Sequence, residues 1–172
     1  MKDGFLKAAA LSPALRVADC AYNTRQILTE LRAAAARGVK LAVFPEFCLT
    51  GYTCGDLFLQ PTLLQQAQAA LEHIRTGSHG SDLITIVGAP LLFESKLYNC
   101  AVFIQNGRFL AVVPKTYLPN YGEFYELRWF TPAPPQNDSV RIGEESVPFG
   151  TRILLCCEQL PELCIAAEIC ED

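Results

Sequence analysis

Three residues of complementary chemistry each follow a short, mostly apolar run of the sequence. They are Glu46, Lys115 and Cys170, after the runs LAVF, FLAVV and LCIAAEI. A cysteine thiolate is a good nucleophile, but at neutral pH the thiol needs a base or a nearby positive charge. A glutamate can be that base, and a lysine can favour the thiolate and stabilise an oxyanion. Such a set without histidine suits acyl transfer from an amide through a thioester.

The positions of these residues at the ends of predicted strands favour one shared site. Apolar runs of this kind are typical of buried strands, and proline ends a strand because it cannot donate to the ladder. Pro45 and Pro114 stand at the same offset in two of the three cases. In parallel α/β sheets, ligands bind beyond the carboxyl ends of the strands. Each residue alone is more simply a surface acid, a surface lysine or a buried thiol, but their joint occurrence favours function.

The periodicity of apolar residues predicts two helices among short strands. Asp19 can cap the first helix, and Pro61 suits the first turn of the second. Strands are expected at residues 5–11, 41–44, 83–88, 97–105, 108–113, 152–156 and 163–169. Asn106-Gly107 predicts a hairpin turn, because a type I′ turn needs positive φ at both positions. The proline-rich residues 131–150 are expected to form a surface loop. This order predicts a layered α/β protein with a mixed sheet.

The composition indicates one globular domain that binds neither nucleic acid nor membrane. The chain has 172 residues, of which 51% are hydrophobic, and a net charge of -4 with scattered basic residues. No apolar stretch is as long as the about 20 residues that a membrane-spanning helix needs. The N-terminus lacks the apolar core of a secretory signal. A cytoplasmic location is therefore expected.

The eight cysteines are expected to be reduced thiols, because the domain is not small and no secretion signal is recognised. The sequence contains no C-x-x-C, and His73 and His79 are its only histidines. Both histidines are expected to be solvated and without a catalytic role. No metal site is therefore expected.

Three blocks of the sequence resemble the signature blocks of the nitrilase, or carbon-nitrogen hydrolase, superfamily. The blocks are FPEFCLTGY around Glu46, VPKTYLPNYGEFYE around Lys115 and EICED around Cys170. The closer resemblance is to the amino-terminal glutaminase domains of glutamine-dependent NAD+ synthases. It spans nearly the whole chain and implies the α-β-β-α sandwich of that superfamily.

The resemblance implies a role for each residue of the predicted site. Glu46 would be the general base, Lys115 the electrostatic stabiliser and Cys170 the nucleophile. Glu123 matches the second acid that superfamily members place beside these three, where it orients the lysine and the substrate. The backbone N–H of Glu171 would help to form the oxyanion hole.

Substrate-binding residues follow from the same resemblance. Tyr52 and Tyr121 match aromatic positions that line the glutamine pocket, although ordinary packing explains them equally well. Glu171 is expected to contact the substrate amine.

The resemblance also implies partners outside this chain. Ammonia from L-glutamine would pass to an ATP-dependent synthetase domain that converts deamido-NAD+ to NAD+. ATP and magnesium would bind there, and no cofactor is expected in this chain, which has no phosphate-binding loop motif. Residues 1–172 are expected to form a partial glutaminase domain, whose parent is a homo-oligomer by family analogy. The synthetase domain is expected to be absent, because the sequence ends two residues after Cys170.

Two other functions remain open from the sequence. One is a stand-alone hydrolase of small amides within the same superfamily. The other is a catalytically silent fragment or interaction module. A sheet that lacks some of its strands would expose unpaired edges, and such edges associate with other chains.

Overall fold

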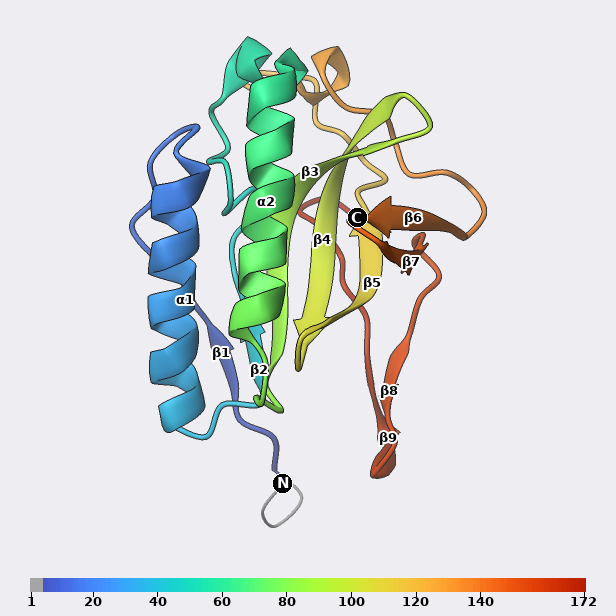
Figure 1. Ribbon diagram of the computed structural model, residues 1–172. Coiled ribbons are helices and arrows are strands. Elements are labelled where there is room, and N and C mark those ends of the chain that lie inside the picture. Colours follow the sequence, from blue (N-terminus) through green and yellow to red (C-terminus); the bar gives the residue numbers. More distant parts are fainter. Residues whose placement is uncertain (1–4) are drawn as a thin grey trace.

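The computed structural model describes residues 5–172 and contains two helices packed on one face of a mixed sheet (Figure 1). The helices are α1 (Cys20–Ala36) and α2 (Pro61–Gly77), and single-turn helices lie at η1 (Gly55–Leu59) and η2 (Glu126–Arg128). The expectation of no secretory signal falls partly on residues 1–4, which lie outside the described residues.

The main sheet has seven strands in the order β1-β2-β3-β4-β5-β7-β6. They are β1 (Ala8–Ala10), β2 (Leu41–Val43), β3 (Ile84–Phe93), β4 (Lys96–Gln105), β5 (Arg108–Pro114), β6 (Asp138–Ile142) and β7 (Glu145–Phe149). Strands β1, β2 and β3 are parallel, and β3, β4 and β5 are antiparallel. The predicted mixed sheet is therefore confirmed.

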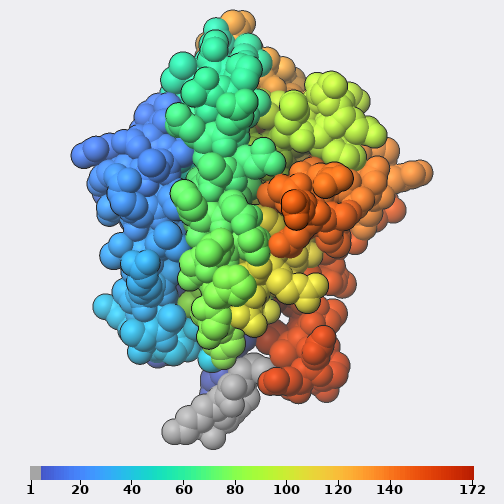
Figure 2. Space-filling model, in the orientation of Figure 1, coloured from blue at the N-terminus to red at the C-terminus, as the bar shows by residue number. Residues whose placement is uncertain are grey.

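Local sequence signals account for both helices. The Asp19 side chain accepts a hydrogen bond from the backbone N–H of Tyr22 at 2.9 Å and so caps α1. Pro61 begins α2, where its missing N–H costs no helical hydrogen bond. Each helix buries one apolar stripe against the sheet, and Figure 2 shows the two helices side by side on this face.

The opposite face of the main sheet carries a second apolar layer. The hairpin of β8 (Leu155–Cys157) and β9 (Leu160–Ile165) belongs to a separate two-stranded sheet. Ile153, Leu155 and Ile165 pack against buried sheet residues such as Phe103. The chain thus has helices on one face of the main sheet and strands on the other, in agreement with the predicted sandwich.

The turn Asn106-Gly107 joins β4 to β5 as predicted, with φ values of 45° and 75°. A second hairpin, which the sequence reading missed, joins β3 to β4 through Glu94 and Ser95. Both of these turn residues also have positive φ, without the Asn or Gly that signals such a turn.

The expectation of a surface loop at residues 131–150 is wrong for its second half. Strands β6 and β7 form a hairpin there, and β7 lies parallel to β5. Val140, Ile142, Val147 and Phe149 are buried while their neighbours are mostly exposed. This alternation is the signal of a half-buried strand, and the prolines obscured it.

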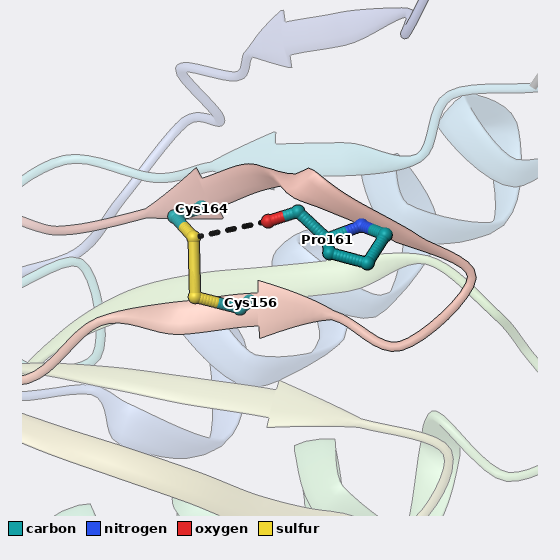
Figure 3. The surroundings of a disulfide bond; sticks show 3 residues. All are labelled: Cys156, Pro161 and Cys164. Atoms are coloured by element: carbon teal, nitrogen blue, oxygen red, sulfur yellow. Dashed lines mark hydrogen bonds between the residues drawn. A yellow bond between two sulfur atoms is a disulfide. The ribbon is translucent and has the colours of Figure 1, made fainter.

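The expectation of eight reduced thiols is also wrong for one pair. Cys156 and Cys164 face each other across the β8–β9 pair, 4.1 Å apart at Cα, and form a disulfide (Figure 3). The register of the hairpin decides this pairing, which spacing alone does not reveal. The other six cysteines are free.

Candidate active site

Lys115 is a fully buried cation held between two acids. Its side chain is 0% exposed, and Nζ donates to Glu126 Oε1 at 2.8 Å and to Glu46 Oε1 at 2.9 Å. Burial by itself lowers the pKa of Lys115, but the hydrogen bonds to Glu126 and Glu46 outweigh it and raise that pKa. The lysine is therefore charged at neutral pH, directly after β5 as the sequence predicted.

The second acid beside Lys115 is Glu126 and not the predicted Glu123. Glu126 is 2% exposed, at the start of η2, whereas Glu123 is exposed in the loop before it. The backbone of Glu126 is tied to Pro119 and Phe130, and the Phe130 ring stacks on Phe47 with 5.0 Å between centroids. The resemblance indicated only Glu123, and this packing places Glu126 beside Lys115 instead.

The turn that carries Glu46 rests on the glycine in the middle of β3. Leu49 N–H donates to the carbonyl of Gly88 at 3.4 Å, and Gly88 N–H approaches the Cys48 sulfur at 3.3 Å. A Cβ on Gly88 would lie 2.3 Å from the Phe47 nitrogen. The absence of a side chain at Gly88 therefore lets the turn approach the sheet and aim Glu46 at Lys115.

Asn99 is a site residue that the sequence reading missed. It lies in β4, is 1% exposed, and its Nδ2 donates to Glu46 Oε1. Its Oδ1 is buried without a hydrogen-bond partner in the described part of the chain. The only sequence signal for Asn99 was its polar side chain within a predicted apolar strand. Such a residue is notable because a buried polar group needs a hydrogen-bond partner.

Cys170 lies on an exposed turn beyond β9, with a φ of 57°. The predicted strand 163–169 ends at Ile165, so four residues separate it from the cysteine. The Asp172 carboxylate accepts hydrogen bonds from the N–H groups of Thr116 (2.9 Å) and Tyr117 (2.8 Å). These bonds tie the Cys170 turn to the segment that follows Lys115.

Glu46 and Cys170 line one cavity of about 290 Å³. Gly88, Asn99 and Ile169 contribute to the same wall. The cavity lies between the β2–β3–β4 part of the main sheet and the segment that leads to Cys170. The structure thus places the predicted acid and thiol on one cavity, and the same acid contacts the predicted lysine.

The three predicted substrate-binding residues separate into two groups. Tyr52 Oη donates to Glu126 Oε1 at 2.6 Å, and burial followed by this hydrogen bond raises the pKa of Tyr52. Tyr121 and Glu171 are exposed, and the Tyr121 hydroxyl donates to the Glu171 carboxylate. Tyr52 thus supports the buried acid, whereas the other pair lies beside Cys170 on the surface.

The remaining thiols differ from Cys170 in burial. Burial raises the pKa of Cys48 to about 12 and that of Cys20 to about 11, and it raises the pKa of Cys100 well above the ordinary value. These thiols keep their protons at neutral pH and are inaccessible. Cys170 is the exposed free cysteine.

Two features are absent from residues 5–172. Within this range, no group of three His, Cys, Asp or Glu side chains is arranged to hold a metal ion. None of the helices in the same range is long and apolar enough to cross a membrane. His73 and His79 are both exposed, as predicted.

Relatives named glutamine-dependent NAD(+) synthetases match almost the whole chain. The glutamine-dependent NAD(+) synthetase of Mycobacterium tuberculosis is 41% identical over 169 residues, which are 98% of this chain and 25% of that protein. The enzyme of the same name from Arabidopsis thaliana is 30% identical over 164 residues, 90% of this chain and 22% of that protein. The chain therefore spans about a quarter of the length of these relatives.

Solved structures share the fold of this chain. A glutamine-dependent NAD(+) synthetase from Cytophaga hutchinsonii superimposes with a TM-score of 0.85 at 29% identity, over 97% of this chain and 28% of that chain. An amidase from Nesterenkonia shares the fold, with a TM-score of 0.68 at 20% identity, over 86% of this chain and 56% of that chain. The carbon-nitrogen hydrolase family model matches residues 7–172. Because that match spans almost the whole chain, this chain belongs to the carbon-nitrogen hydrolase family.

Proposed function

We propose that this chain is a glutaminase domain, in which Cys170 attacks the side-chain amide of L-glutamine. The observation that carries the proposal is the buried, charged Lys115, paired with an acid that shares a cavity with an exposed thiol. Glutamine is the proposed substrate because the relatives that match most of the chain are named glutamine-dependent.

In the first half of the reaction, Glu46 takes the thiol proton and the Cys170 sulfur bonds to the amide carbon. The carbonyl π electrons move to oxygen, and Lys115 stabilises this oxyanion. Two Lys115 N–H groups already bind carboxylates, which leaves one of its three donors for the oxyanion. The backbone N–H of Glu171, which donates no backbone hydrogen bond in the described chain, completes the oxyanion site.

In the second half, the C–N bond breaks and Glu46 returns its proton to the departing nitrogen, so that ammonia leaves. A water molecule then loses a proton to Glu46 and attacks the thioester carbon. The C–S bond breaks, glutamate is released, and Cys170 recovers its proton. The net reaction converts glutamine and water to glutamate and ammonia.

Glu126 explains how the site tolerates the neutral form of Glu46. When Glu46 holds a proton, Lys115 would be an unpaired buried cation, which is strongly unfavourable. Glu126 keeps Lys115 paired through the cycle, and the Tyr52 hydroxyl supports Glu126. The buried pair thus keeps its charge while Glu46 exchanges protons.

The ammonia is proposed to serve an ATP-dependent synthetase that acts on deamido-NAD+. This step rests on the names of the relatives, in which the matched part is only about a quarter of the protein. ATP and magnesium are assigned to that other part. We also propose a homo-oligomeric parent, as the family analogy implies, and a cytoplasmic location.

The exposed pair Tyr121 and Glu171 favours glutamine over a small neutral amide. A carboxylate beside Cys170 can bind the α-ammonium of glutamine, which acetamide lacks. A stand-alone amidase should therefore hydrolyse both compounds and survive Glu171→Gln, whereas the glutaminase should lose activity on glutamine.

Mass spectrometry of the folded chain after exposure to a glutamine-like diazo-ketone tests the proposal. One adduct on Cys170 is expected, absent in Cys170→Ala and slower in Glu46→Gln and Lys115→Ala. Labelling spread over several cysteines, at rates that ignore Glu46 and Lys115, would show that these residues form no catalytic site. A catalytically silent module would give that second result.

A further inference from the structure

Asn99 approaches the site from a strand that carries none of the predicted catalytic residues. The N–H of Lys115 donates to the Asn99 carbonyl at 2.8 Å, so the β4–β5 pairing places the two residues opposite each other. The Asn99 side chain is 1% exposed and lines the cavity that contains Glu46 and Cys170. Its position is therefore held by the sheet and not by a mobile loop.

The two donors to Glu46 converge on the same carboxylate oxygen. Asn99 Nδ2 and Lys115 Nζ both donate to Oε1. No hydrogen bond within residues 5–172 reaches Oε2, and Oε2 is not among the buried side-chain atoms that lack a partner. Because Glu46 lines the cavity with Cys170, Oε2 is the oxygen that remains available to the cavity.

One hydrogen bond to Oε1 would leave the carboxylate free to rotate about the axis of that bond. A second donor from a different strand fixes the carboxylate plane and therefore the direction of Oε2. The other charged or titratable groups near Glu46 are Tyr52, Cys170 and, through Lys115, Glu126. None of these donates to Glu46 in the described chain, so Asn99 supplies the second constraint.

We propose that Asn99 is a positioning residue for amide hydrolysis, which directs Glu46 so that Oε2 exchanges protons with Cys170 and the leaving nitrogen. This inference rests on the proposed role of Glu46 as the base. The amide of Asn99 also suits both protonation states of Glu46. When Oε2 carries the proton, Oε1 is the carbonyl oxygen of the acid, so the Asn99 N–H donates to Oε1 in both states.

The test measures the rate of Cys170 alkylation by a glutamine-like diazo-ketone across the neutral pH range. Asn99→Leu keeps the approximate size of the side chain but removes both hydrogen-bonding groups. The rate at neutral pH should fall about tenfold, which corresponds to the free energy of about one hydrogen bond to a charged group. The acidic limb of the rate profile should move to higher pH, because the carboxylate loses a donor.

Two comparisons separate positioning from a merely structural role. Thr85→Val removes another buried, unpartnered side-chain oxygen from the neighbouring β3 and should change neither rate nor profile. In a Glu46→Gln background, Asn99→Leu should cause no further loss, because its effect passes through Glu46. Asn99→Asp, which is nearly isosteric, should move the acidic limb in the same direction and serves if the leucine variant does not fold.

The outcomes are distinguishable. An equal loss from Asn99→Leu with and without Glu46, or an unmoved acidic limb in both Asn99 variants, would overturn the positioning role alone. A wild-type alkylation rate in Glu46→Gln would instead reject the proposed base, and with it the inference.

Discussion

Gly88→Ala should disable the site without touching any of its functional groups. The added Cβ would lie 2.3 Å from the Phe47 nitrogen, 2.8 Å from the Pro45 carbonyl oxygen and 2.9 Å from the Glu46 carbonyl carbon. All three are backbone atoms of the turn that carries Glu46, so no side chain can rotate to relieve the clash. The turn must move away from β3.

The size of that movement follows from the contact distances. Real Cβ contacts essentially never fall below 3.0 Å, so the turn must shift by about 0.7 Å or more. The Glu46–Lys115 hydrogen bond, 2.9 Å in the wild type, would then lengthen or bend beyond a good geometry. A misplacement of about 1 Å costs on the order of 100-fold in rate. Overpacking should also lower the free energy of unfolding by about 1–3 kcal/mol.

Two measurements check this prediction, namely the Cys170 alkylation rate and the free energy of unfolding in urea. Gly77→Ala is the matched control, because its Cβ would meet only the end of the flexible Leu28 side chain. We expect Gly77→Ala to alkylate at the wild-type rate. A Gly88→Ala variant with wild-type stability and alkylation rate would refute the claim that this glycine sets the position of Glu46.

Three further predictions concern the ion pairs and the disulfide. Glu126→Gln should slow Cys170 alkylation and lower the free energy of unfolding by about 2 kcal/mol, because the buried Lys115 cation loses the negative charge of one of its two carboxylate partners. Glu123→Gln should change neither quantity, and equal effects of the two substitutions would contradict the assignment of the second acid. The pKa of Lys115 is raised, because its hydrogen bonds outweigh the effect of burial. The contribution of charged Lys115 to the free energy of unfolding is therefore complete below about pH 10.4, the ordinary lysine pKa, and is lost as the pH rises through the pKa of the folded state. Urea unfolding at alkaline pH should therefore show that the wild type loses stability and that Lys115→Met does not lose it to the same extent. If stability falls with pH in parallel in the two proteins, Lys115 is not the group responsible. Replacing Cys156 by Ser should lower the free energy of unfolding by about 2–3 kcal/mol under oxidising conditions, because it opens a short closed loop to Cys164. With reductant present, the two proteins should unfold at the same urea concentration, and a persistent difference would show that the disulfide is not the cause.

Part of the fold was predictable because its signals are local. The cap at Asp19, the proline at the start of α2 and the Asn106-Gly107 turn each act within a few residues. The β6–β7 hairpin was missed because its alternation is short and contains Pro148. The β3–β4 turn was missed because Glu94 and Ser95 are not turn-specific residue types.

The candidate site also contains residues that local sequence signals predict and residues that they do not. Glu46 and Lys115 were predictable because each follows an apolar run and a proline, and strands that run in the same direction end at the same edge of a sheet. Choosing Glu126 over Glu123 required knowing which acid is buried. That choice depends on Phe130 stacking on Phe47, which is far away in the sequence.

The sequence by itself determined the family, both helices and the two ends of the buried ion pair, because these depend on residue type and on spacing along the chain. Only the tertiary structure decided that Glu126 is the second acid, that Asn99 reaches Glu46 and that Cys156 pairs with Cys164. These three results depend on register and burial between distant segments. A buried polar group or thiol takes whichever partner the packed chain places within reach, and that partner is set by the whole fold.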